Sequence, residues 1–106
     1  MKEITVEELK AKKDQNESFF LLDVREPVEY HVSNIEGELI PLGELPSRVA
    51  ELNPHKDAEV IVMCRAGGRS AKAVEFLEAQ GFSSISNLKG GMKAWAKEID
   101  PSLPVG

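Results

Sequence analysis

The sequence predicts an α/β fold in which a mainly parallel sheet of about five strands carries helices on both faces. Short apolar runs alternate along the chain with stretches of helical periodicity, which is typical of this class. The runs Phe19–Val24 and Val60–Met63 lack the polar alternation of a half-exposed strand, so they indicate buried strands. A chain of 106 residues is the size of one domain with one core, and we expect a single domain over residues 1–106.

The first half of the chain begins with a helix signal. Thr5 and Glu8 have the spacing of a capping box, which predicts a helix from there to about Lys13. Its inward face is expected to carry Val6, Leu9 and Ala11. The other elements expected here are an extended segment at Ile4, a helix from Pro27 to about Val32, a very short strand at Leu39–Ile40, and a helix through Arg48, Val49 and Leu52 that stops at Asn53-Pro54.

The second half continues the alternation of strand and helix. Apolar side chains at helical spacing predict a helix over about Arg69–Gln80, and Gly81 follows as its cap. The remaining elements are a strand at Ser84–Leu88 and a final helix that opens at Gly90-Gly91, packs Trp95 into the core and ends at Pro101. Sites in parallel sheets form at the carboxyl ends of strands, so the segment after Asp23 and the loop after Met63 should share one edge.

That loop carries the clearest chemical signal in the sequence. The only cysteine, Cys64, ends a buried strand and is followed by two arginines that flank two glycines. Gly67 and Gly68 allow successive backbone N–H groups to turn toward one point, and the helix N-terminus adds a positive dipole end. A thiol in this setting should have a lowered pKa and react as a thiolate. A cysteine that served only as a small core residue would need neither the arginines nor the glycines.

Composition excludes several classes of function. The net charge of −5 argues against a surface for nucleic acid or an anionic membrane. One cysteine cannot form an internal disulfide, and no apolar run is long enough for a bilayer or a signal peptide, so we expect a cytoplasmic protein. His31 and His55 have no companion ligands at metal spacing, so no metal is expected. We expect a monomer, because no heptads or long exposed apolar run are present.

Five segments in this order resemble the rhodanese-like family of persulfide-forming sulfurtransferases. They are Leu21–Tyr30, Ile35–Gly37, Ile40–Leu42, the active loop Cys64–Ser70, and Leu88–Trp95. More narrowly, three stretches are similar to the sulfurtransferase domain of molybdopterin-synthase adenylyltransferase/sulfurtransferase proteins: Ser33–Ile35, Ile40–Pro46 and Glu98–Pro104. Those proteins carry an adenylylating domain that this chain lacks, so it is either an excised domain or a free-standing relative.

The resemblance implies that Cys64 accepts a sulfane sulfur as a persulfide and passes it to a nucleophilic acceptor, with no separate cofactor. The persulfide-binding loop would consist of Arg65, Ala66, Gly67, Gly68, Arg69 and Ser70. Arg65 is expected to attract anionic donors such as thiosulfate, and Arg69 either to bind substrate or to brace the loop by pairing with a carboxylate. Asp23 and Arg25 are expected to form a supporting ion pair, with an acid–base role for Asp23 as the alternative.

The sequence leaves two alternatives for the physiological partners. The protein is either an enzyme that uses thiosulfate or a relay that transfers sulfur between proteins. A relay would use a cysteine desulfurase as donor and a small sulfur-carrier protein as acceptor, in molybdopterin or thiolation pathways. Two other classes compete with sulfur transfer. A phosphatase or arsenate reductase would need a Cys-x5-Arg loop, whereas four residues separate Cys64 from Arg69. A non-catalytic binding module is the second alternative, and the presence of Cys64 with its arginines and glycines weighs against it.

Overall fold

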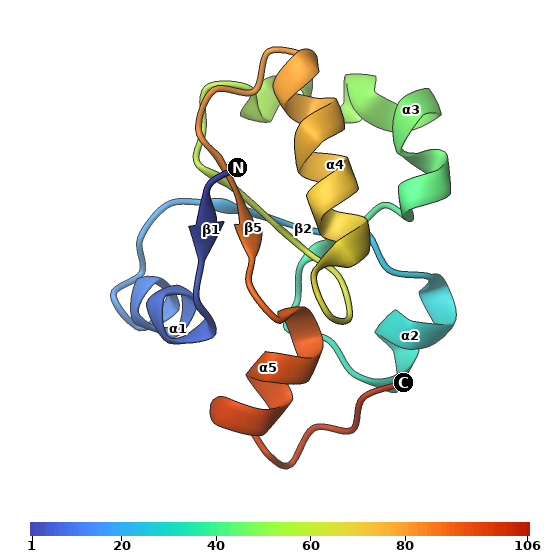
Figure 1. Cartoon of the computed structure of the whole chain (residues 1–106). Coiled ribbons are helices and arrows are strands. Elements are labelled where there is room, and N and C mark those ends of the chain that lie inside the picture. Colours follow the sequence, from blue (N-terminus) through green and yellow to red (C-terminus); the bar gives the residue numbers. More distant parts are fainter.

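Five parallel strands form one sheet in the computed structural model, which describes all residues 1–106 (Figure 1). The strands are β1 (Glu3–Ile4), β2 (Phe20–Asp23), β3 (Glu38–Leu39), β4 (Val60–Met63) and β5 (Ile85–Leu88), in the order β1-β5-β4-β2-β3. Every neighbouring pair is parallel, and β4 lies at the centre between β5 and β2. The expected five-stranded α/β architecture is therefore confirmed.

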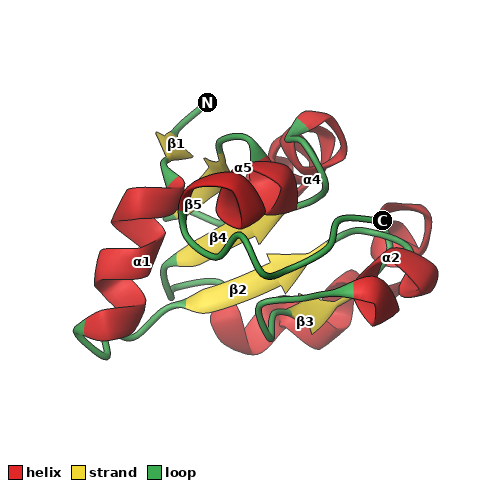
Figure 2. Ribbon diagram, turned by 90° about the horizontal axis from the view of Figure 1, so that it is seen from below, coloured by secondary structure: helices red, strands yellow, loops and turns green.

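Helices cover both faces of this sheet (Figure 2). They are α1 (Val6–Asp14), α2 (Pro27–Val32), α3 (Leu45–Arg48), α4 (Gly68–Ala79) and α5 (Gly91–Glu98), with 3-10 turns η1 (Leu42–Glu44) and η2 (Val49–His55) around α3. None of these helices is both long and apolar enough to span a bilayer.

Two hydrophobic clusters follow from the alternation of side chains along the buried strands. Val60 and Val62 of β4 point to the cluster that α3, η2 and α4 complete. Ile61 and Met63 point to the opposite cluster, completed by α1 and α5, where Trp95 packs as expected. The central strand β4 is thus enclosed on both faces, so its carboxyl end is a rigid support for the loop that begins at Cys64.

The capping box at the start of α1 is confirmed, but the expected inward face of this helix is wrong in one position. The Thr5 hydroxyl accepts from the Glu8 N–H at 3.1 Å, and the Glu8 carboxylate accepts from the Thr5 N–H at 2.9 Å. Ala11 is exposed. At 100° per residue it falls away from the face of Val6 and Leu9, whereas Lys13 returns to it and donates to the Ile35 carbonyl at 3.1 Å.

The segment expected as one helix through Leu52 is divided in the structure. The short helix α3 ends at Arg48, and the chain continues as the 3-10 turn η2 through Pro54 to His55 instead of stopping at Asn53. Proline has no N–H to donate, so the segment is completed by short-range turns rather than by regular α-helical hydrogen bonds. Strand β3 is also shifted by one residue, to Glu38–Leu39, although the Ile40 N–H still donates to the Asp23 carbonyl at 3.0 Å.

Candidate active site

Cys64 lies directly after the central strand β4, and the turn that follows it closes around its sulfur. The side chain is buried, and the Gly67 N–H donates to Sγ at 3.1 Å. Gly67 has a φ of +113°, a left-handed conformation that favours glycine and that directs the chain into α4 at Gly68. Asp23 of β2 pairs in register with Met63, so the two expected segments do share one edge of the sheet.

The surroundings of the thiol favour its ionised form. Burial by itself would raise the pKa of Cys64, but hydrogen bonding outweighs it. The Ser70 hydroxyl and the backbone N–H groups of Ser70, Gly67 and Ala66 together bring the pKa of the Cys64 thiol below its usual value. The loop therefore supplies a preorganised set of donors that stabilises negative charge on this sulfur.

A buried polar chain connects this sulfur to the neighbouring strand β5. The Ser70 hydroxyl lies 3.3 Å from Cys64 Sγ and 2.5 Å from Asn87 Oδ1. Asn87 Nδ2 in turn donates to the Gly67 carbonyl at 3.2 Å. Asn87 thus holds both the hydroxyl and the turn in place. From the sequence, Asn87 was expected only as part of the strand Ser84–Leu88; the available signal was a polar residue near the carboxyl end of a strand.

Replacing Ser70 with alanine should raise the pKa of the Cys64 thiol, because one of the hydrogen bonds that stabilise the thiolate is removed. The pH profile of Cys64 alkylation by iodoacetamide should move to higher pH. At pH 7 the alkylation rate should fall roughly tenfold, the worth of one hydrogen bond to a charged acceptor.

Ser86→Ala provides the matched control for this measurement. Ser86 is also a buried serine, but it precedes Asn87 on β5 and its side chain points to the other face of the sheet. An unchanged profile in Ser70→Ala, or an equal displacement in Ser86→Ala, would contradict a direct role of the Ser70 hydroxyl.

The first turn of α5 holds the loop from the other side. The Met92 N–H donates to the Cys64 carbonyl and the Lys93 N–H to the Arg65 carbonyl, both at 2.9 Å. Gly91 allows this approach: a Cβ at this position would lie 2.3 Å from the Cys64 carbonyl oxygen. The two backbone segments therefore contact each other without an intervening side chain.

The two arginines of the loop have different partners. Arg69 forms a bidentate ion pair with Glu29 of α2, with N–O distances of 2.6 and 2.7 Å. Arg65 donates from Nε to a backbone oxygen of Gly106 at 2.7 Å and has no carboxylate side chain as a partner. Of the two roles expected for Arg69, the geometry agrees with bracing by a carboxylate. Glu29 was not singled out from the sequence, because its partner lies 40 residues away along the chain.

Asp23 and Arg25 form the expected ion pair, and both side chains are fully buried. Arg25 Nη2 lies 2.9 Å from an Asp23 carboxylate oxygen and also donates to the Ser33 carbonyl at 2.9 Å. Its Nη1 donates to the Glu29 carbonyl at 3.3 Å. Arg25 therefore ties α2 to the end of β2, and α2 in turn presents the Glu29 carboxylate to Arg69.

The side chains of the other residues singled out from the sequence make no hydrogen bond to this set. Ala66 and Gly68 are exposed at the surface of the loop. His31 is exposed, and His55 stacks on the Phe20 ring with 3.9 Å between ring centroids. The structure contains no group of three or more His, Cys, Asp or Glu side chains placed to hold a metal ion.

The chain is similar to proteins of a known family. Residues 5–98 match the profile of the rhodanese-like domain. In Bacillus subtilis, the putative sulfur carrier protein YrkF is 42% identical, over 92% of this chain and 52% of its own length. The putative sulfurtransferase YtwF from the same organism is 37% identical, over 95% of this chain and 96% of its own. The probable adenylyltransferase/sulfurtransferase MoeZ of Mycobacterium tuberculosis is 36% identical, over 94% of this chain and 26% of its own.

Solved structures agree with the sequence comparisons. A rhodanese-like domain protein from Staphylococcus aureus superposes with a TM-score of 0.83 at 36% identity, covering 100% of this chain and 99% of that one. The chain spans only a quarter to a half of the length of MoeZ and YrkF, whereas it spans nearly all of YtwF.

Proposed function

The chain belongs to the rhodanese-like domain family, and on that basis we propose that it is a sulfurtransferase that carries sulfane sulfur as a persulfide on Cys64. Sulfur transfer in general is supported by relatives named as sulfurtransferases and as a sulfur carrier. The observation that carries the proposal is the position of Cys64 Sγ, which is buried at a strand end and ringed by donors that lower the thiol pKa.

The proposed reaction has two displacement steps at sulfur. The Cys64 thiolate attacks the sulfane sulfur of a donor, which forms a new S–S bond and breaks the old one. With thiosulfate as donor, sulfite leaves with the electron pair of the broken bond. A nucleophilic acceptor then attacks the outer sulfur, and Cys64 leaves as a thiolate. No net oxidation or reduction of the protein is required.

The loop residues have assigned roles in this proposal. The N–H groups of Ala66, Gly67 and Ser70 and the Ser70 hydroxyl stabilise first the thiolate and then the anionic terminal sulfur. Gly68 begins α4 and adds its dipole, while Arg65 supplies positive charge at the mouth of the loop. Thiolate chemistry supported in this way needs no general base, so Asp23 and Arg25 act structurally.

Two features favour sulfur over phosphate chemistry at this site. The loop is one residue shorter than the Cys-x5-Arg loop of a phosphatase or arsenate reductase. In those enzymes the arginine cradles the oxyanion, whereas here Arg69 is already paired in bidentate fashion with Glu29. The proposed donor is a small sulfur compound or a cysteine desulfurase. The proposed acceptor is a small thiophilic compound or a small sulfur-carrier protein in molybdopterin or thiolation pathways.

Turnover with alternative substrates tests the proposal. The purified protein should convert thiosulfate and cyanide to thiocyanate, and Cys64→Ser should lose this activity entirely. Hydrolysis of p-nitrophenyl phosphate is measured in parallel with the same two proteins. Cys64-dependent phosphate release without thiocyanate formation would instead support a phosphatase.

A further inference from the structure

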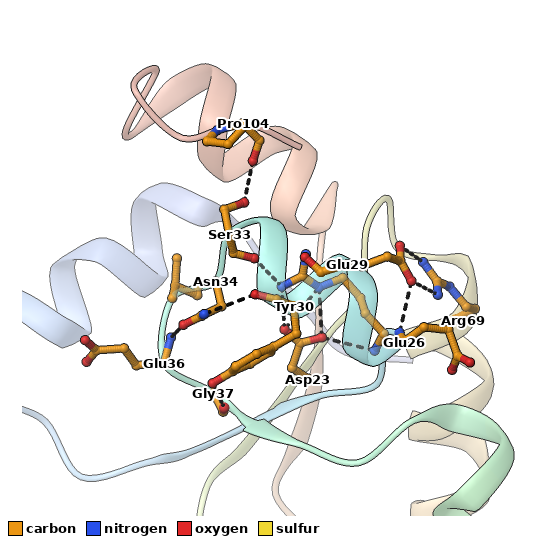
Figure 3. A network of polar contacts seen from close by, with 12 residues as sticks. Asp23, Glu26, Glu29, Tyr30, Ser33, Asn34, Glu36, Gly37, Arg69 and Pro104 are labelled. Atoms are coloured by element: carbon orange, nitrogen blue, oxygen red, sulfur yellow. Dashed lines mark hydrogen bonds and ion pairs between the residues drawn. The ribbon is translucent and has the colours of Figure 1, made fainter. Parts of the chain in front are cut away.

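The ion pair between Arg69 and Glu29 changes the charge that the loop presents to a donor. Glu29 lies on α2, outside the loop, yet both of its carboxylate oxygens bind the guanidinium of the second loop arginine (Figure 3). The Glu29 side chain is only 16% exposed, so water replaces these contacts poorly. One of the two positive charges of the active loop is therefore already neutralised.

This pair persists over the whole physiological range of pH. The Arg69 guanidinium, aided by the Glu26 N–H, lowers the pKa of the Glu29 carboxyl to about 2. Hydrogen bonding to Glu29 raises the pKa of Arg69 above its usual value, and the charge of Cys64 contributes in the same direction. Arg69 lies five residues after Cys64, in the first turn of α4 at the end of the loop.

We propose that Glu29 is a specificity-determining residue that selects against dianionic small donors such as thiosulfate and in favour of persulfide donors that bring a single negative charge. This inference rests on the proposed sulfur-transfer function and concerns the donor of that same site. A thiosulfate dianion that binds Arg69 would either displace the Glu29 carboxylate from its two donors or lie beside the negative charge of that carboxylate.

The repulsion between the Glu29 carboxylate and a sulfur donor depends on the charge of the donor. Repulsion between Glu29 and a donor scales with the donor's charge, so a dianion is opposed about twice as strongly as a monoanion. Arg65, whose Nε donates to a backbone oxygen of Gly106, supplies the other positive charge of the loop. The site therefore still attracts anions, but Glu29 reduces the advantage that a dianion would have over a monoanion.

Glu29→Gln tests the proposal with little change in shape, because the amide oxygen can still accept from the Glu26 N–H. Two readouts are compared in the intact protein: the rate at which thiosulfate loads one sulfur on Cys64, and the ratio of alkylation rates by iodoacetate and iodoacetamide. The two alkylating reagents have nearly the same shape and differ by one charge. The alkylation ratio should rise about fivefold at low salt, and the loading rate relative to iodoacetamide about 25-fold, because the dianion carries twice the charge.

Glu26→Gln is the matched control. Glu26 is an exposed carboxylate at the start of α2, and it does not pair with Arg69. This variant should change either readout less than twofold. Equal rises in the two variants, or no rise in Glu29→Gln, would overturn the assignment of specificity to Glu29. If no donor loads sulfur on any variant, the proposed function fails, while the alkylation ratio still reports whether Glu29 shields the site from anions.

Discussion

Arg25→Met should lower the free energy of unfolding by about 3–5 kcal/mol, because it leaves the buried Asp23 carboxylate without its partner. Asp23 and Arg25 are both fully buried, so neither charge can be solvated after the change. The variant also removes the donors to the Ser33 and Glu29 carbonyls, which hold α2 in place. Urea denaturation followed by circular dichroism measures the loss.

Arg48→Met is the control that separates burial from charge. Arg48 forms ion pairs with Glu44 and Glu51, but its side chain is 34% exposed and both partners are more exposed still. Its replacement should cost at most about 1 kcal/mol. If the two variants lost comparable free energy of unfolding, the buried Asp23–Arg25 pair would contribute no more to stability than an exposed pair.

Gly91→Ala should slow persulfide formation by about 100-fold, because the close approach of α5 to the loop leaves no room for a methyl group. The added Cβ would meet the Cys64 carbonyl oxygen at 2.3 Å and the Arg65 carbonyl carbon and oxygen at 2.8 Å. All three are backbone atoms, so relief requires the loop itself to move. The φ of +55° adds strain for any residue with a side chain.

Gly43→Ala controls for the loss of a glycine as such. A Cβ at Gly43 would have no atom within 4 Å, so this variant should load sulfur at the wild-type rate. Both rates are determined per folded molecule, with the folded fraction taken from thermal melts. A wild-type rate in folded Gly91→Ala would mean that the contact between α5 and the loop does not position Cys64.

The sequence predicts the sheet and the turn after Cys64 well because local signals dominate there. Val60–Met63 is a continuous apolar run, and the glycines after Cys64 mark both the turn and the start of α4. These features depend on residues that are neighbours along the chain. The same is true of the capping box of Thr5 and Glu8.

The remaining parts depend on contacts that the chain makes only after folding. Glu29 meets Arg69, and Asn87 meets Ser70, across 40 and 17 residues respectively. No periodicity or spacing along a single sequence reports such pairs. The expected inward position of Ala11 failed for a local reason, because at 100° per residue Ala11 lies away from the face of Val6 and Leu9.

The intact mass of the reduced protein after incubation with a sulfane-sulfur donor tests the central claim most directly. Excess donor is removed before the measurement, and Cys64→Ser is treated in the same way. We expect a gain of one sulfur atom in the wild type, which dithiothreitol or cyanide reverses and which is absent from the variant. No gain with thiosulfate or with a persulfide-loaded cysteine desulfurase, or an equal gain in Cys64→Ser, would contradict it.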